Sequence, residues 1–382
     1  MSTSASQTFT NLSEKIAGYD AVCLFSGGTD STVTAMKTKE RVNGGKVLLL
    51  TLDTGIGEEE IKKSVERAKL IGFDHLMYDG IDEFCDVYIA SAIQMNADYQ
   101  GFPLGTPLAR AMAFDIAIRA LKGEGDKLLS LGSTRCQNTR LRAIRVLNHV
   151  PNIKVYAPLA DQVLSRGEKV ELLKDYDFPV GIADNFSTDE NLWSRCTESH
   201  EINKINLTEM DPRWFQLTVD LHDAVDTPEI IELTFQDGLP VAVNGEPMKL
   251  SDVIRRLNDI GRVHALGRII NVEDTAFGDK IRSIYEAPGA EIILKTHAFI
   301  ESIVMNKYER DRKAILDKRW GEMMYHGDWN SPERLQIESE VMPWQMKVTG
   351  TLKVELYKGN IRILDGHVPD SLLLKKEVGG LY

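Results

Sequence analysis

The stretch that decides the fold of this chain is Ala21-Val22-Cys23-Leu24-Phe25-Ser26-Gly27-Gly28-Thr29-Asp30-Ser31. Its first five residues form an apolar run typical of a buried parallel strand, and a helical pattern follows from Thr32 to about Lys39. A strand, a glycine turn and a helix N-terminus expose unpaired backbone amides at the positive end of the helix dipole. Two glycines let the backbone approach phosphate oxygens, and the hydroxyls add donors. We therefore predict a phosphate-binding loop at Ser26–Ser31.

The loop lacks the lysine of the common NTPase phosphate loop, G-x-x-x-x-G-K-[ST]. Its pattern, Ser-Gly-Gly-x-Asp-Ser, instead resembles the pyrophosphatase loop (PP-loop) of enzymes that split ATP into AMP and pyrophosphate. That resemblance implies adenylation rather than transfer of the γ-phosphoryl group. An ordinary glycine turn is the alternative, which the flanking strand and helix disfavour.

Composition places the chain among soluble globular enzymes. Its 382 residues exceed an average domain, so we expect two, and 43% hydrophobic with 27% charged residues is ordinary for that class. The net charge of -12 argues against a nucleic-acid partner. Apolar runs are too short for a membrane span and the start lacks a signal pattern, so we expect no membrane association. Four cysteines without C-x-x-C spacing predict a reduced, cytoplasmic protein.

Strand and helix patterns alternate through the first half of the chain. This alternation predicts right-handed crossovers and an α/β fold whose doubly wound parallel sheet has helices on both faces. The expected strands are 20–25, 46–53, 74–78, 127–132 and 153–157, and the expected helices are 30–41, 57–71, 81–95, 106–123, 137–148 and 167–176. Ligands of such sheets bind beyond the carboxyl ends of the strands, where both Ser26 and Thr134 fall.

The rhythm changes after about residue 178, and the rest of the chain predicts an α+β domain. We expect strands at Leu217–Val219, Ile230–Phe235 and Pro240–Val243, turns at Asp237-Gly238 and Asn244-Gly245, helices at 250–261 and 286–319, and a terminal hairpin of Met346–Lys358 against Arg362–Leu364. The predicted division is a tail (1–17), a nucleotide-binding domain (18–178) and an α+β domain (179–382).

Four further segments, in order along the chain, match one family. They are Gly105-Thr106 with Leu108-Ala109-Arg110, Gly132-x-Thr134 with Asn138 and Arg142, Ser187-x-Asp189-Glu190-Asn191-Leu192, and Glu273 with Arg282-x-Ile284-Tyr285-Glu286. With the loop, they resemble the argininosuccinate synthase family over about residues 20–370. The resemblance implies an adenine nucleotide alpha-hydrolase-like first domain and a synthetase and multimerisation domain. It implies a homo-oligomer, a dimer or tetramer, and against the family pattern we expect a shortened C-terminal arm.

In that family, a ureido oxygen of citrulline attacks the α-phosphate of Mg-ATP, and the amine of aspartate then displaces AMP. The resemblance implies that ATP is held by Ser26, Gly27, Gly28, Asp30, Ser31, Thr32 and Gly132, and that Mg²⁺ is carried by ATP. It implies that Thr134 and Asn138 hold aspartate, and that Asn138, Arg142, Ser187, Glu273 and Tyr285 hold citrulline. Because this reaction needs orientation more than an acid or base, none is assigned, and Asn138 and Arg142 position the reactants.

Taken singly, several of these residues have a structural alternative. Arg142 lies in Arg140-x-Arg142-x-x-Arg145, which could be a solvated basic face. Ser187 could be a helix N-cap, a role compatible with ligand binding. Glu273 alone would be a surface carboxylate, and Tyr285 alone would be core packing.

The chain departs from the family pattern around both amino-acid sites. The family has tyrosine at Phe102, serine at Pro107, aspartate at Thr139, serine at Cys196 and Gly-Lys-Gly at Arg135-Cys136-Gln137. Lost hydrogen-bonding groups weaken discrimination, because polar substrate atoms are left unpaired. The predicted amino-acid pocket comprises Phe102, Thr106, Thr134, Asn138, Thr139, Arg142, Ser187, Cys196, Glu273 and Tyr285. Arg135 and Arg142 could read an additional carboxylate.

These observations favour an ATP-dependent, AMP- and pyrophosphate-forming C–N ligase whose choice of amino-acid substrates has changed. The first alternative is a genuine argininosuccinate synthase of arginine biosynthesis. A tRNA-modifying PP-loop enzyme is disfavoured by the acidic charge and the absence of paired catalytic cysteines. A non-catalytic homologue is disfavoured by the complete loop.

Overall fold

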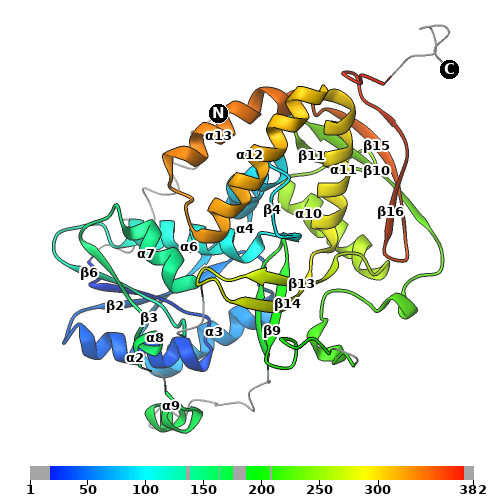
Figure 1. Ribbon diagram of the computed structural model, residues 1–382. Coiled ribbons are helices and arrows are strands. Elements are labelled where there is room, and N and C mark those ends of the chain that lie inside the picture. The colour runs from blue at the N-terminus through cyan, green and yellow to red at the C-terminus, as the bar shows by residue number, and fades with distance from the viewer. Residues whose placement is uncertain (1–17, 135–137, 163, 175–185, 207–208, 374–382) are drawn as a thin grey trace, which may run out of the picture.

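The computed structural model describes residues 18–134, 138–162, 164–174, 186–206 and 209–373 (Figure 1). The predicted tail and Arg135-Cys136-Gln137 lie outside these ranges. A five-stranded parallel sheet in the order β3-β2-β1-β6-β7 forms the first half of the fold, as predicted. Its strands are β1 (Ala21–Leu24), β2 (Val47–Asp53), β3 (Asp74–Asp79), β6 (Lys127–Ser130) and β7 (Ile153–Tyr156).

Helices cover both faces of this sheet. Alternate residues of β1 and β2 enter two separate apolar clusters: Val22 and Leu48 enter one, Cys23 and Leu49 the other. The helices are α2 (Thr29–Arg41), α3 (Glu58–Ile71), α4 (Ile81–Glu83), the π-helix η1 (Phe84–Ile89), α5 (Ala90–Gln94), α6 (Gly105–Ala120), α7 (Thr139–Leu147), α8 (Pro158–Asp161) and α9 (Arg166–Leu173). Burial on both faces is why the strands read as continuous apolar runs, and it confirms the doubly wound α/β prediction.

The second half holds a five-stranded antiparallel sheet with helices beside it. Its strand order is β12-β11-β10-β15-β16. The elements are β10 (Glu229–Gln236), β11 (Leu239–Val243), β12 (Glu246–Pro247), α10 (Leu250–Val263), α11 (Pro288–Val304), α12 (Lys307–His326), α13 (Pro332–Gln345), β15 (Gly350–Tyr357) and β16 (Asn360–His367). The predicted single helix 286–319 is wrong. It is two helices, because Asn306 and Glu309 form a capping box that starts α12.

A four-stranded antiparallel sheet, in the order β13-β14-β9-β8, was not predicted. In the view of Figure 1, β13 and β14 lie between the parallel sheet and the β10–β15–β16 sheet. The strands of this sheet are β8 (Phe186–Glu190), β9 (Arg195–Ser199), β13 (Arg268–Asp274) and β14 (Lys280–Glu286). Outside it lie the hairpin of β4 (Asp98–Tyr99) and β5 (Phe102–Pro103) and the 3₁₀ turns η3 (Pro212–Trp214) and η4 (Leu221–Asp223). The predicted strand Leu217–Val219 is wrong, because the amides of Leu217 and Thr218 bond to the Glu286 carboxylate.

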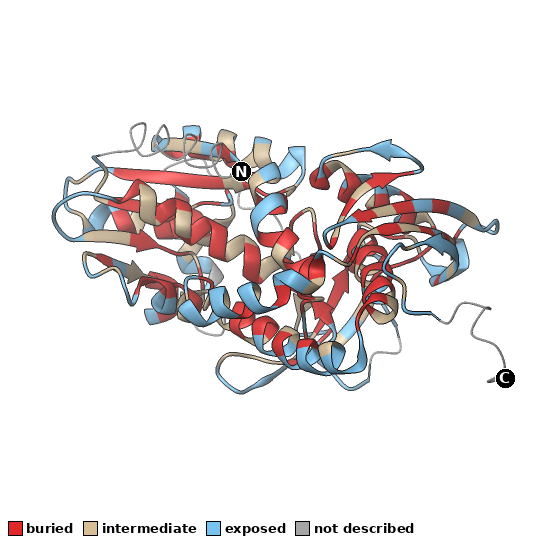
Figure 2. Ribbon diagram, turned by 90° about the horizontal axis from the view of Figure 1, so that it is seen from above, coloured by how far each residue is buried: buried red, intermediate tan, exposed pale blue. Residues whose placement is uncertain are grey.

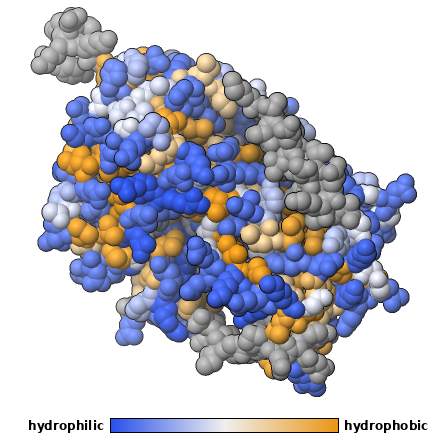
Figure 3. Space-filling view, turned by 180° about the vertical axis from the view of Figure 1, so that it is seen from behind, coloured by the Kyte–Doolittle hydropathy of each residue, from blue (hydrophilic) through white to orange (hydrophobic). Residues whose placement is uncertain are grey.

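Burial follows the layers of the fold. Figure 2 shows buried residues along the strands and on the inner sides of the helices, with exposed residues on the outer sides. On the face opposite to that of Figure 1, hydrophobic residues gather in several separate groups among hydrophilic ones (Figure 3). Within the described part of the chain, no helix is both long and apolar enough to cross a bilayer.

Candidate active site

The Ser26–Ser31 loop joins β1 to α2, as predicted. Gly27 has a φ of +72°, and a Cβ there would lie 2.9 Å from the Cα of Ser64, so conformation and space both require glycine. Gly28 is the N-cap of α2 and provides no side-chain cap. The first-turn amides are therefore available to an anion. The hydroxyls of Ser31 and Thr32 donate back to the Gly28 carbonyl, at 3.0 and 2.8 Å, which makes the turn compact.

Neighbouring elements hold this loop in place. Arg67 of α3 donates to the Gly27 carbonyl, and Lys169 of α9 donates to Asp30 at 2.7 Å. Gly132, after β6, packs against the first turn of α2, because a Cβ there would lie 3.1 Å from the Ser31 backbone. The two cations lie beside the predicted phosphate site. Sequence reasoning missed both, because each is distant in sequence from the loop it contacts.

One face of the β13-β14-β9-β8 sheet gathers the downstream motif residues. Paired residues of antiparallel strands share a face, and Tyr285 pairs with Cys196, which pairs with Asp189. Two residues further along, Glu198 pairs with Ser187 on the same face. The hydroxyl of Tyr285 donates to the carboxylate of Glu273. We call this the acidic face, and it comprises Ser187, Asp189, Cys196, Glu198, Glu273 and Tyr285.

An aromatic ring covers part of the acidic face. Phe102 of β5 is 2% exposed and stacks on Tyr285, with ring centroids 4.2 Å apart and planes 9° from parallel. Thr106 and Pro107 lie in the first turn of α6, which begins at Gly105. Gly105 packs closely against Asn191, because a Cβ on Gly105 would lie 2.7 Å from Oδ1 of Asn191. Where the family pattern has a tyrosine, this pocket has an apolar ring.

Helix α7 contributes Asn138 as its N-cap and Thr139 as its first residue. Nδ2 of Asn138 donates to the Tyr325 hydroxyl at 2.9 Å, and its Oδ1 accepts from the Ala276 amide at 2.9 Å. Arg142 is 5% exposed, and its Nε donates to the Tyr325 carbonyl at 2.6 Å. The alternative of a solvated basic face is therefore wrong for Arg142.

Burial and like charges shape the electrostatics of the acidic face. Burial, then the neighbouring charges of Glu273 and Asp189, raise the pKa of Glu198 to about 7. Burial also raises the pKa of the Cys196 thiol, which keeps it protonated at neutral pH. Glu273 is only 4% exposed, so the surface-carboxylate alternative is wrong. Such a cluster suits a cationic group of a ligand, because a buried cation would relieve the repulsion.

The predicted site residues do not all lie together. Five of them are linked through contacts with Tyr325 or with one another: Phe102, Asn138, Arg142, Glu273 and Tyr285. Ser187 is exposed on the edge strand β8, so its N-cap alternative is wrong. Tyr285 belongs to the hydrophobic core, so its core-packing alternative is confirmed. Its hydroxyl also donates to Glu273, another predicted site residue. Thr134 follows β6 and precedes the undescribed Arg135-Cys136-Gln137.

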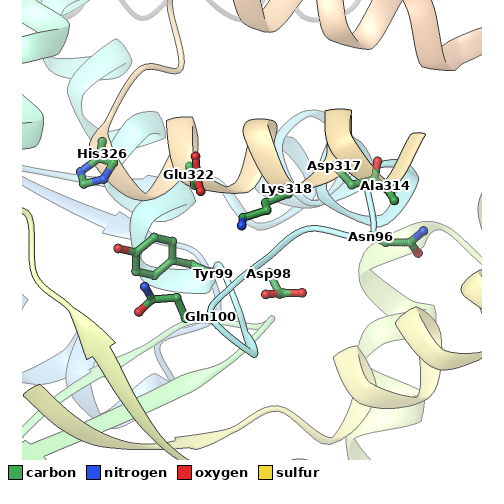
Figure 4. A pocket seen from close by; sticks show the side chains of 9 residues that line it. All are labelled: Asn96, Asp98, Tyr99, Gln100, Ala314, Asp317, Lys318, Glu322 and His326. Atoms are coloured by element: carbon green, nitrogen blue, oxygen red, sulfur yellow. The ribbon is translucent and has the colours of Figure 1, made fainter. Parts of the chain in front are cut away.

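Sequence reasoning missed three contacts of this site, namely Tyr99, Glu198 and Tyr325. The Arg142–Tyr325 hydrogen bond joins residues 183 positions apart, and no local pattern signals such a pair. Beside the site, between α12 and the β4–β5 hairpin, lies a cavity of about 600 Å³ (Figure 4). Tyr99 and His326 lie at one end of it, and Asp317 at the other.

Family models match nearly the whole chain. The model described as "Arginosuccinate synthase N-terminal HUP domain" covers residues 20–179, and the one described as "Arginosuccinate synthase C-terminal domain" covers residues 186–379.

Relatives named argininosuccinate synthase match over most of their length. The one from Methanocaldococcus jannaschii is 35% identical over 94% of this chain and 91% of its own. That from Methanothermobacter thermautotrophicus is 33% identical over 94% and 90%, and that from Pyrococcus furiosus is 34% identical over 92% and 85%. With the PP-loop, the parallel sheet and the acidic face in place, the chain belongs to the argininosuccinate synthase family.

Proposed function

We propose that the protein is an ATP-dependent C–N ligase that forms AMP and pyrophosphate, and that it joins a substrate pair other than citrulline and aspartate. The observation that carries the second part is the Phe102–Tyr285 stack. It sets an apolar ring against the acidic face where the family pattern has a hydroxyl. A pocket that lacks a donor leaves the matching substrate atom unpaired, which weakens binding strongly.

The nucleotide half supports retention of the adenylation chemistry. The first turn of α2 has no side-chain cap, so its amides can donate to phosphate oxygens. With Gly27 and Gly132 beside it, this turn forms a cradle that fits those oxygens. Arg67 and Lys169 would add positive charge beside it. Mg²⁺ would enter with ATP and offset charge on the phosphates when bound. This chain's part is to hold the phosphates and expose the α-phosphorus to the second substrate.

The amino-acid half fits a zwitterion. Nε of Arg142 donates its hydrogen bond to the Tyr325 carbonyl. The two terminal nitrogens of the Arg142 guanidinium would therefore be the donors to a substrate carboxylate. Glu198 and Glu273 would accept an ammonium or another cationic group on the acidic face. Holding a substrate between these charges orients its nucleophile toward ATP, which is the main requirement of the reaction.

The site of the attacking amine supports a changed partner. The family pattern has an aspartate where this chain has Thr139, and a threonine offers no negative charge to an ammonium group. Thr139 begins α7, next to Asn138, so the change lies at the proposed aspartate position. We propose that the second substrate is an amine other than aspartate.

The test is a pyrophosphate-release screen with ATP. Citrulline with aspartate is compared with a panel of ureido and guanidino compounds, each offered with a series of amines, and products are identified by mass. We expect release with a pair from the panel and little with citrulline and aspartate. Equal or better turnover with citrulline and aspartate would instead establish the second candidate, a genuine argininosuccinate synthase in arginine biosynthesis, which the 35% identity over 94% of the chain favours.

Two variants of one residue test the phosphate cradle. Gly28→Ala should fold and bind ATP, because a Cβ there would meet only the Ser26 hydroxyl, at 3.4 Å. Gly28→Asp should abolish ATP binding, because it adds a negative charge at the N-terminus of α2. Turnover that survives Gly28→Asp would show that the cradle is misassigned.

Assembly and location form the remaining part of the proposal. We propose a cytoplasmic homo-oligomer, a dimer or tetramer, with amino-acid substrates and no nucleic-acid or membrane partner. The nucleotide-binding domain would end near residue 178. Light scattering after size-exclusion chromatography should give a mass of two or four times 42.8 kDa, and a monomer would contradict it.

A further inference from the structure

Tyr325, the residue before the last in α12, contacts three of the predicted pocket side chains. Its hydroxyl accepts a hydrogen bond from Nδ2 of Asn138 at 2.9 Å, and burial and then the neighbouring Glu273 carboxylate raise the pKa of this hydroxyl. Its backbone carbonyl accepts from Nε of Arg142 at 2.6 Å, and the Arg142 guanidinium lies 4.8 Å from the ring centre. One tyrosine therefore links the start of α7 to the end of β13.

The surroundings hold Tyr325 in one position. It is 1% exposed, and Tyr99 stacks on its ring with centroids 3.7 Å apart and planes 8° from parallel. Gly327 follows with a φ of +91°, and a Cβ there would lie 2.9 Å from the Cα of Arg142. Only glycine lets the end of α12 approach α7 this closely. The contacts of Tyr325 therefore depend on how α12 docks against α7.

We propose that Tyr325 is a positioning residue of the amino-acid site, which orients Asn138, Arg142 and Glu273 for substrate; this inference rests on the function proposed above. A phenol hydroxyl has one proton to donate and lone pairs that accept, so it can bridge an amide and a carboxylate. The amide of Asn138 is held at both ends, by Tyr325 and by the Ala276 backbone. Without the Tyr325 hydroxyl, the Asn138 amide loses one of its two partners and can rotate beside Glu273.

The β4–β5 hairpin supports the tyrosine from the other side. The hydroxyl of Tyr99 donates to the Asp274 carbonyl at 3.0 Å, beside Glu273. The ring of Tyr99 also lines one end of the 600 Å³ cavity, as Figure 4 shows. Tyr99 therefore borders this cavity and also stacks on the Tyr325 ring.

The experiment removes the bridging hydroxyl and nothing else. Tyr325→Phe keeps the ring, the stack on Tyr99 and the carbonyl that binds Arg142. Tyr308→Phe is the matched control, because Tyr308 lies on the same helix and is 81% exposed. Both variants are assayed with the wild-type chain for pyrophosphate release, using the substrate pair found in the screen. The KM of each substrate, kcat and Tm are measured.

We expect Tyr325→Phe to raise the KM of an amino-acid substrate about tenfold. The KM of ATP should change less than about twofold, and Tm should stay within about 3 °C of the wild type. Tyr308→Phe should match the wild type in every respect. Equal KM values for Tyr325→Phe and the wild type would overturn the positioning role, because a purely structural ring is retained in that variant. A parallel loss for ATP and amino acid would overturn it as well.

The wild-type chain separates this inference from the proposed function. Wild-type turnover with an unaffected Tyr325→Phe variant overturns the role of Tyr325 alone. Absence of wild-type turnover with every pair overturns the proposed ligase and, with it, the role of Tyr325 in that reaction. Tyr325→Leu adds a further comparison, because it also removes the stack and should lower both substrate affinity and Tm.

Discussion

The β13-β14-β9-β8 sheet buries carboxylates on both faces, and the two faces differ in how these are satisfied. On the face opposite the acidic one, Glu286 has no exposed surface and accepts hydrogen bonds from Arg195 at 3.1 Å and from the amides of Gln216, Leu217 and Thr218 at 2.9 to 3.0 Å. On the acidic face, burial and then the neighbouring like charges raise the pKa of Glu198 to about 7.

The comparison separates a carboxylate whose charge the fold satisfies from one whose charge it does not. Burying a charge is costly unless donors replace its water, and Glu286 has such donors from a cation and from the backbone. Glu198 faces Glu273 and Asp189 instead, an arrangement that costs stability and that a bound cation would relieve. We infer that the first face holds the fold together and the second recognises substrate.

The largest expected effect comes from breaking the structural face. Glu286→Ala leaves Arg195, which is 4% exposed, with only the partly exposed Glu190 as a counter-charge and should cost about 3–5 kcal/mol of unfolding free energy. Urea denaturation followed by circular dichroism measures this. The control is Glu340→Ala, which removes an exposed pair with Arg312 and should leave the unfolding free energy nearly unchanged, because solvent screens that pair. Similar losses in both variants would contradict the assignment.

The next effect comes from removing a charge on the acidic face. Glu273→Gln keeps an oxygen that can accept from Tyr285 and removes the negative charge, so folding should be nearly unchanged. The KM of the substrate that presents a cation should rise roughly 10–100-fold, because a charge-assisted hydrogen bond is lost. Initial-rate measurements of pyrophosphate release give the KM. An unchanged KM together with a large fall in stability would make Glu273 structural, like Glu286.

A smaller effect concerns the pH dependence of stability. The pKa of Glu198 rises from 4.5 to about 7 on folding, so the folded protein keeps a proton that the unfolded chain releases. The contribution of Glu198 to the free energy of unfolding is fully present below about pH 4.5 and is lost as the pH rises through 7. Glu198→Gln should therefore be more stable than the wild type at pH 8, by about 1–3 kcal/mol, and equal to it near pH 4.5.

The measurement is a series of urea unfolding curves for both proteins between pH 4.5 and 8. Glu340→Gln serves as the control, because the Arg312 guanidinium lowers the pKa of the exposed Glu340 carboxyl. A difference between wild type and Glu198→Gln that does not vary with pH would contradict the raised pKa of Glu198.

The smallest expected effect is at Cys196. Its thiol is buried and lies 3.9 Å from a carboxylate oxygen of Glu198. Cys196→Ser places there the hydroxyl of the family pattern, which can donate to Glu198, so stability should change by less than about 1 kcal/mol. The low rate of pyrophosphate release with citrulline and aspartate should rise modestly, about threefold or less. A loss of stability as large as that of Glu286→Ala would show that the acidic face is packed as tightly as the opposite one.

The nucleotide half of the fold could be predicted because its signals are local. Each strand of the parallel sheet is buried on both faces and reads as a short apolar run, and each crossover helix follows within the next residues. The loop at Ser26–Ser31 combines a strand, a turn and a helix start within one segment. The start of α12 carried a similar signal, since Asn306 and Glu309 have capping-box spacing, but a single helix, 286–319, was predicted across them.

The substrate half could not be predicted from local patterns. The strands β8 and β9 read Phe-Ser-Thr-Asp-Glu and Arg-Cys-Thr-Glu-Ser, with polar side chains on both faces. Such segments form strands here because charges are paired across the sheet, as Arg195 is with Glu286. The Ser-Thr-Asp-Glu run also imitates a helix start, which is why an N-cap was considered at Ser187.

The sequence alone determined the parallel sheet, the phosphate loop and the family, because periodicity and ordered motifs survive without knowledge of contacts. Only the tertiary structure decided which buried carboxylate is satisfied by donors, as Glu286 is, and which lies beside like charges, as Glu198 does. It also decided that Tyr325 meets Arg142 across 183 positions of the chain. The physical reason is that burial and charge pairing depend on which strands and helices meet, and these contacts join segments that are remote in sequence.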